Sequence, residues 1–156
     1  MDWLPEIIPF DGNWEEYEDS LYQSYSRLYQ NDDLYYSGQK VREKYDPAIN
    51  KKSCTFWHII SEGEEESERT PNFERCARIA WPRAIIQNCD DPAVSVWVEP
   101  RSGGKGDRVH FWIEEHDYLV VLAKRNSGYL LWTAFCITYE SNRKGLASRR
   151  NRYQKS

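Results

Sequence analysis

Proton transfer near neutral pH is the chemistry that the histidines of this chain could perform. The 156 residues contain three of them, His58, His110 and His116. Cleavage of RNA without a metal needs one group to take the proton of the 2′-hydroxyl and another to protonate the leaving oxygen. His58 stands in an apolar block, where a packed histidine is an equal alternative, and His116 belongs to an expected exposed turn. No Ser-His-Asp or Cys-His grouping of a nucleophilic enzyme is legible.

Metal-ligand spacing is found once in the chain. The pair Cys54-x3-His58 would place two ligands on one helical face, but no second pair with zinc-like spacing follows. We therefore predict no metal site and no cofactor. Four cysteines are too few for a disulfide scaffold in a chain of 156 residues. With no signal-peptide pattern at the start and no apolar run of membrane-spanning length, we expect thiols, a cytoplasmic protein and no membrane partner.

The two halves of the chain differ in charge. Residues 1–72 hold 7 Lys and Arg against 16 Asp and Glu, a net charge of −9, whereas residues 73–156 hold 14 against 9, a net charge of +5. This asymmetry predicts that the C-terminal half contacts something anionic, while the acidic half shields it or faces another partner. The alternative is that both charge runs are solvated faces.

Apolar spacing predicts mainly helices in the first half of the chain. Residues 14–29 form an amphipathic pattern with acids in the first turns, and a weaker helical pattern covers residues 34–44. The acid-rich run 61–69, which follows the apolar block 54–60, predicts a mobile loop. A further helical pattern starts at Phe73, and Pro82 kinks it or opens a second helix.

Near residue 90 the apolar period changes from 3.6 to 2. Four strands are expected, at 94–98, 108–115, 118–125 and 129–137. Their short connections imply an antiparallel meander. We therefore predict an α+β fold in one domain of residues 1–156: N-terminal helices on a four-stranded antiparallel sheet, followed by a basic segment. That segment, residues 140–156, is expected to be a short helix that Gly145 interrupts and that frays into a tail.

Alternation assigns the two faces of the expected sheet. Its apolar side, expected to pack on the helices, carries Val94, Val96, Val98, Val109, Phe111 and Ile113. The other side would be an open face with Trp97, Glu99, Arg108, His110, Trp112 and Glu114, joined by Lys124 or Arg125 and by Thr133 or Trp132. Rings that stack on unpaired bases and cations that contact phosphates are what an RNA site needs. We add Lys105 of the glycine-rich loop, which lacks P-loop spacing, and Arg143 and Lys144 of the basic segment as phosphate contacts.

From Arg75 onward the chain resembles a known superfamily. The matching stretches are the helix RCARIAWPRAII, then DYLVVLAKR, NSG and YLLWTAFCITYE, and then the basic tail RKGLASRRNRYQ. They are similar to the barnase, EndoU, colicin-type and RelE-like ribonucleases, particularly the phage and mobile-element branches. The resemblance covers about half of the chain and includes the Thr133-Ala134 pair in the last strand.

The resemblance implies roles for individual residues. Thr133 would position the substrate, Arg75 or Arg78 would clamp a phosphate, and Lys124 or Arg125 would be the cation of the transition state. Tyr139 would stack or shuttle a proton, and His58 looks like the histidine that some members place on a helix before the sheet. No Glu-His pair of the barnase kind is visible, so the base and the acid stay unassigned.

These observations predict a metal-independent endoribonuclease of the toxin or phage-conflict type, which leaves a 2′,3′-cyclic phosphate. RNA would be its substrate, and a cognate antitoxin or inhibitor protein would be its partner. The alternative is a non-catalytic phage or host-takeover protein that binds RNA or a protein through the sheet face. A third hypothesis is an inhibitor whose acidic half mimics nucleic acid.

Overall fold

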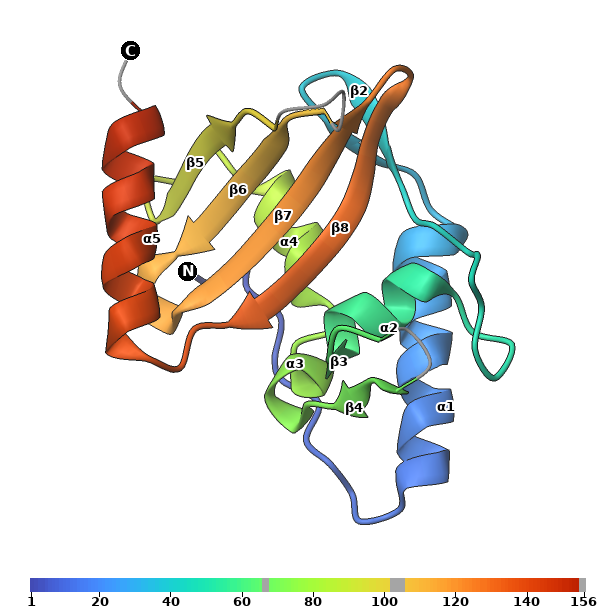
Figure 1. Cartoon of the computed structure of the whole chain (residues 1–156). Helices are drawn as coiled ribbons and strands as arrows, with labels where there is room; N and C mark the ends of the chain where they lie inside the picture. The colour runs from blue at the N-terminus through green and yellow to red at the C-terminus, as the bar shows by residue number, and fades with distance from the viewer. Residues whose placement is uncertain (66–67, 102–105, 155–156) are drawn as a thin grey trace.

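A six-stranded sheet with helices on both faces forms the centre of the molecule (Figure 1). The computed structural model describes residues 1–65, 68–101 and 106–154. The helices are α1 (Trp14–Tyr25), α2 (Cys54–Ile60), α3 (Phe73–Ala77), α4 (Trp81–Gln87) and α5 (Glu140–Tyr153), with a π-helical turn η1 (Ser26–Gln30) and a 3-10 turn η3 (Glu114–His116). The strands of the sheet are β1 (Leu34–Tyr36), β2 (Gln39–Arg42), β5 (Val94–Glu99), β6 (Arg108–Ile113), β7 (Tyr118–Arg125) and β8 (Gly128–Cys136).

The meander expected after residue 90 is confirmed. Strands β5, β6, β7 and β8 lie side by side in chain order, and each pairs antiparallel with the next. One irregularity interrupts the β7–β8 ladder: Val121 pairs with Thr133 and Leu122 pairs with Leu131, so Trp132 has no partner opposite it. This arrangement is a β-bulge, with an extra residue on β8.

The prediction of a helix at residues 34–44 is wrong. This segment is the hairpin β1–β2, whose turn residues Ser37 and Gly38 have φ angles of 51° and 75°. Two successive left-handed residues make the turn whose twist matches a two-residue hairpin. Strand β2 runs parallel to β8 through Val41 and Arg42, so the expected four-stranded antiparallel sheet is a mixed sheet of six strands.

One face of the sheet packs on the N-terminal helices, as the alternation predicted. Val94, Val109, Phe111 and Ile113 are buried in one cluster with apolar side chains of α1, α2 and α4, whereas Val98 at the end of β5 is 43% exposed. Asn13 caps α1, because its side chain accepts a hydrogen bond from the backbone N–H of Glu16 (3.1 Å).

The opposite face is not open over β5 and β6. Helix α5 lies across these strands (Figure 1), and Leu146 packs into a second buried cluster with Trp97, Trp112, Leu119 and Val121. The helix is continuous from Glu140 to Tyr153, so Gly145 does not interrupt it. The expectation of an open aromatic face is therefore wrong for Trp97, His110 and Trp112, which are at most 3% exposed.

The acidic run after α2 has more structure than the expected loop. Its two ends pair as the short strands β3 (Ser61–Glu62) and β4 (Thr70–Pro71). The Arg69 guanidinium donates hydrogen bonds to the carbonyl oxygens of Ser61 (2.5 Å) and Gly63 (2.8 Å). Among the residues that the structure describes, no helix has both the length and the apolar character to cross a membrane.

Candidate nucleic-acid interface

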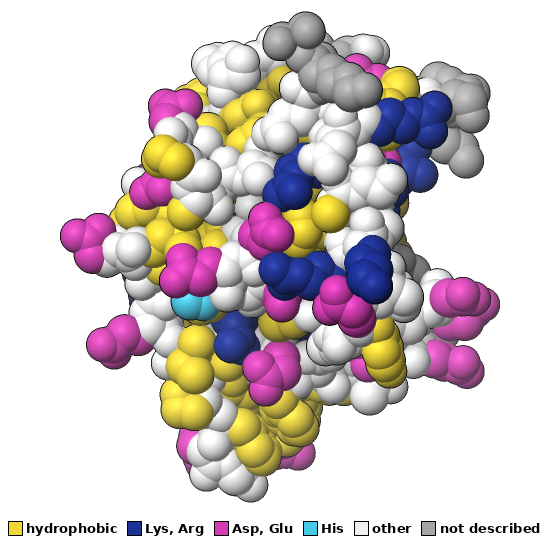
Figure 2. Space-filling view, turned by 90° about the vertical axis from the view of Figure 1, so that its left-hand side faces the viewer, with side chains coloured by type: hydrophobic (Ala, Val, Ile, Leu, Met, Phe, Trp, Pro, Cys, Tyr) yellow, Lys and Arg dark blue, Asp and Glu magenta, His cyan; other side chains and the backbone are white. Residues whose placement is uncertain are grey.

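Three arginines converge beside the β7–β8 turn. Arg101, Arg108 and Arg125, with Trp132, line a hollow of about 920 Å³, here called the arginine pocket. The guanidinium carbons of Arg108 and Arg125 lie 4.8 Å and 6.0 Å from the centre of a Trp132 ring. Gly106, Lys124 and Asn126 complete the described lining, which includes no carboxylate. Seen from the α5 side, Lys and Arg side chains gather at the upper right of the molecule (Figure 2).

The electrostatics of this pocket favour an anion. Burial lowers the pKa of Arg108, and repulsion from Arg125 and Arg101 lowers it further. A bound phosphate would reduce this repulsion and accept several hydrogen bonds from the guanidiniums at once. Gly106 helps to close the pocket: its φ is +74°, and a Cβ atom there would stand 2.4 Å from the Lys124 carbonyl oxygen. A residue with a side chain at position 106 would therefore be strained.

The structure decides which of the two adjacent cations faces the pocket. Arg125 extends over Trp132, on the same side of the sheet as Arg108. The Lys124 ammonium lies 4.6 Å from the centre of the Tyr129 ring and donates a hydrogen bond to the side-chain oxygen of Gln39. Lys124 reaches the pocket lining without pointing its ammonium at Trp132, because consecutive strand residues point to opposite faces.

The sequence left open whether Trp132 or Thr133 faces the α5 side of the sheet, and in the structure both do. Trp132 and Thr133 line a common groove even though they are consecutive on β8. The bulge at Trp132 explains this, because an extra residue on one strand interrupts the alternation of side chains.

A groove continues from the arginine pocket between β8 and α5. It measures about 620 Å³ and shares Arg101 and Trp132 with the arginine pocket. We call it the β8–α5 groove. Its described lining combines apolar and aromatic side chains with a few polar ones, as small-molecule sites do. The residues on which the argument depends are Glu62, Arg75, Thr133, Phe135, Tyr139, Asn142, Gly145 and Leu146.

Three of the residues predicted to be catalytic meet in this groove: Arg75, Thr133 and Tyr139. The Arg75 guanidinium lies 5.4 Å from the centre of the Phe135 ring and donates hydrogen bonds to the carbonyl oxygens of Ser61 (2.5 Å) and His58 (3.2 Å). Burial lowers the pKa of Arg75. Tyr139 is 69% exposed at the entrance to α5.

His58 acts on this site through its backbone. Its carbonyl oxygen accepts hydrogen bonds from the Thr133 hydroxyl and from Arg75, both at 3.2 Å. The imidazole Nδ1 lies 3.3 Å from the Trp132 carbonyl oxygen, and Nε2 lies 3.6 Å from the Cys54 sulfur. The ring therefore packs within α2 and against β8, and His58 is not among the described residues that line either hollow.

Arg78 does not join the other predicted catalytic residues. It donates hydrogen bonds to the Glu74 carboxylate (2.9 Å) and to the Glu74 carbonyl (3.0 Å), and it lies over the Trp81 ring at 4.9 Å. Of the two predicted phosphate clamps, only Arg75 lies at the groove.

The residues predicted to stack on bases hold α5 in place. Trp97 and His110 are buried beside the partly buried Glu99 carboxylate, which pairs with Arg149 of α5 at 2.9 Å. Burial lowers the pKa of His110 to about 4 and outweighs the opposing effect of Glu99. Among the described residues, the buried His110 Nδ1 and Trp112 Nε1 have no hydrogen-bond partner.

The remaining predicted phosphate contacts are dispersed. Arg143 pairs with Asp117 and, at 3.4 Å, with Glu114, which ties α5 to the end of the sheet. Lys144 is exposed on the helix. Lys105 lies outside the described residues.

Sequence reasoning missed three residues of this interface. Arg101 stands just after β5, at the border of the pocket and the groove, and Glu62 brings a carboxylate from β3. Gly145, predicted to interrupt the helix, lies within continuous α5 and lines the groove. The register of the meander could have predicted that Arg108 and Arg125 share a face. Arg108 pairs with Ala123, and Arg125 follows Ala123 by two residues on the same strand.

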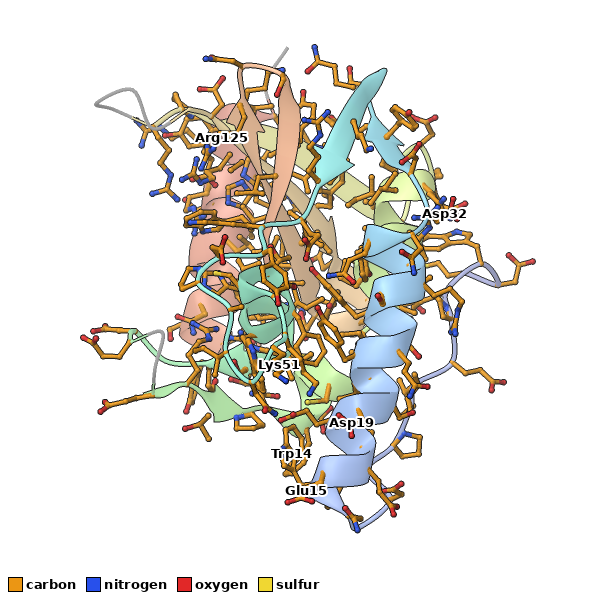
Figure 3. The ribbon with its side chains drawn as sticks, turned by 90° about the vertical axis from the view of Figure 1, so that its right-hand side faces the viewer. Trp14, Glu15, Asp19, Asp32, Lys51 and Arg125 are labelled. Carbon is orange, nitrogen blue, oxygen red and sulfur yellow. The ribbon has the colours of Figure 1, made fainter. Side chains whose placement is uncertain are left out.

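The acidic end of the molecule lies away from the arginine pocket. Glu15 and Asp19 of α1 are at the lower end of Figure 3, whereas Arg125 is at the upper left. Among the described residues, none from the acidic half lines the arginine pocket. Within the described ranges, no group of three or more His, Cys, Asp and Glu side chains is placed to hold a metal ion.

Comparison with family models, curated proteins and solved structures found no match to this chain.

Proposed function

We propose that this protein binds single-stranded RNA, with backbone phosphate in the arginine pocket. The convergence of Arg101, Arg108 and Arg125 around Trp132, with no carboxylate in the described lining, is the observation that supports it. Guanidinium groups suit phosphate because they present several donors in a plane, and an aromatic ring beside them suits an unpaired base. A cytoplasmic location is part of the proposal.

The salt dependence of RNA binding tests this proposal. Each phosphate contact on a single strand contributes about −0.7 to the slope of log K against log salt, so three arginines correspond to a slope of about −2. Fluorescence anisotropy with labelled single-stranded RNA gives this slope. Arg101→Ala should reduce its magnitude by about 0.7, whereas Arg27→Ala, an exposed charge-matched change in η1, should not. A flat salt response of the folded wild-type protein would refute the proposal.

A second candidate function is metal-independent cleavage of the bound RNA. It is favoured by Glu62, Arg75 and Tyr139, which line the groove that opens at the arginine pocket. In this reaction the 2′-oxygen bonds to phosphorus while its proton passes to the Glu62 carboxylate. The bond from phosphorus to the 5′-oxygen breaks, the Tyr139 phenol protonates that oxygen, and a 2′,3′-cyclic phosphate is left. The arginines would stabilise the charge on the pentavalent phosphate.

End-group analysis separates this candidate from binding alone. Purified protein is incubated with total RNA and EDTA, and cyclic-phosphate ends are measured. Glu62→Gln should lower their yield by about 10²–10⁴-fold, the usual effect of one proton-transfer group. Folded protein that binds RNA and yields no such ends is a binding protein only.

A further inference from the structure

We infer that the β8–α5 groove binds one unpaired nucleobase of the RNA strand whose phosphate lies in the arginine pocket. The inference rests on the proposed RNA binding and names the part of the strand that the groove recognises. Its first support is continuity: Arg101 and Trp132 belong to both hollows. A base is attached to the phosphate backbone through one sugar, so adjoining sites of these two kinds suit a nucleotide.

The chemistry of the groove walls matches a base. Trp132, Phe135 and Tyr139 supply aromatic rings along β8 and just after it. Base stacking on such rings contributes about 1–3 kcal/mol per base. Thr133 and Asn142 supply a hydroxyl and an amide, which are able to hydrogen-bond the polar edge of a base.

The shape of the groove favours a single strand. One wall is β8 and the other is α5, which is anchored at both ends of the sheet by Arg143 to Asp117 and by Arg149 to Glu99. Bases in a duplex present only their edges, whereas an unpaired base can be splayed out of its strand and inserted into such a groove.

Gly145 is the strongest sign that the groove is kept open. Asn142, Gly145 and Arg149 lie on one side of α5 at spacings of three and four, and all three line the groove. A Cβ atom built on Gly145 meets no atom within 4 Å. Glycine in a helix interior costs roughly 0.5–1 kcal/mol relative to alanine. Helix α5 therefore gives up stability at a position that lines the groove.

Filling the groove from Gly145 tests the inference. Anisotropy is measured with two RNA strands of equal length and equal phosphate number, one with all its bases and one abasic throughout. The wild-type protein should prefer the strand with bases by about 5- to 150-fold, the range that 1–3 kcal/mol represents. Gly145→Leu should bring this ratio close to 1 and leave the salt slope unchanged, because the arginine pocket is intact. Ser148→Leu, at an exposed position of α5 that is not among the described residues lining the groove, is the matched control and should keep the preference.

The outcomes separate this inference from the proposed function. Equal binding of both strands by the wild-type protein, with a steep salt slope, overturns the base site and leaves phosphate binding standing. The absence of salt-dependent binding to either strand overturns the proposed function itself. If circular dichroism shows that Gly145→Leu unfolds α5, Asn142→Leu replaces it as the groove-filling variant. Asn142 is exposed and lies one helical turn before Gly145. An undiminished preference in a folded groove variant contradicts the inference, and the groove would then be examined for a protein partner.

Discussion

Trp97 and His110 stack on each other beneath helix α5, with ring centroids 5.2 Å apart and ring planes inclined by 9°. The His110 Nε2 atom faces both the Glu99 carboxylate (3.5 Å) and the Arg149 guanidinium (3.3 Å). Trp97 and His110, whose rings were predicted to stack on RNA bases, thus stack on each other in the protein interior. It joins the meander to the C-terminal helix, and the surface available to a ligand is displaced toward β7 and β8.

The buried imidazole predicts loss of stability in mild acid. His110 has a pKa of about 4 in the folded protein, below its ordinary 6.5, because burial disfavours the charged ring. Folding therefore favours the neutral imidazole. The contribution of His110 to the free energy of unfolding is complete above pH 6.5 and falls as the pH is lowered toward 4. This difference in pKa corresponds to a loss on the order of 3 kcal/mol.

Urea unfolding at pH values between 7.5 and 4 measures this effect. His110→Gln should flatten the pH dependence between 6.5 and 4.5, above the range in which carboxylates dominate. His116→Gln, at an exposed position, is the control and should leave it as in the wild type. Equal pH profiles for the wild-type protein and His110→Gln would show that His110 titrates alike in the folded and unfolded states.

Leu146 should control the docking of α5. It is the one residue of this helix that is buried, and it packs in a cluster with Trp97 and Trp112. Leu146→Ala should cost about 2–5 kcal/mol because the removed side chain leaves a cavity. Acrylamide quenching of tryptophan fluorescence should rise as Trp97 and Trp112 become accessible. Lys144→Ala, at an exposed site on the same helix, should leave quenching unchanged.

The parts of the fold that the sequence predicted are those where one period runs through a whole element. Strands β5 to β8 have six to nine residues each, which is enough for alternation to show. The strands β1 and β2 have three and four residues, too few to establish a period of 2, and the apolar spacing of Leu34 and Val41 also fits a helix. The turn at Ser37 and Gly38 was the better signal.

The site was harder to predict because it depends on tertiary contacts. Helix α5 has one buried apolar residue, so no stripe in its sequence shows that it covers Trp97 and Trp112. The bulge that turns both Trp132 and Thr133 toward the groove leaves no mark in the sequence. Composition did indicate a cationic surface in the C-terminal half, but which cations share a face follows from the register of β6 and β7.

His58 should contribute to stability rather than to RNA binding. Its ring contacts the Cys54 sulfur and the Trp132 carbonyl oxygen, so His58→Ala removes packing and hydrogen bonds within the fold. We expect a loss of about 1–3 kcal/mol in the free energy of unfolding, seen as a lower melting temperature, with RNA affinity unchanged at temperatures where the variant is folded. A loss of cleavage by 10²–10⁴-fold at an unchanged melting temperature would instead identify His58 as a proton-transfer group.

Two adjacent cations offer the most closely matched test of the arginine pocket. Arg125 extends over Trp132 beside Arg108, whereas the Lys124 ammonium lies over Tyr129 on the other face of the sheet. Arg125→Ala should weaken binding of single-stranded RNA and reduce the magnitude of the salt slope by about 0.7, because one phosphate contact is lost. Lys124→Ala removes the same formal charge one residue away and should leave the slope unchanged. Anisotropy titrations over a salt series compare the two variants directly. Equal losses of RNA affinity in both variants would mean that binding depends only on the net charge of this end of the sheet. A loss of affinity confined to Lys124→Ala would place the phosphate on the opposite face.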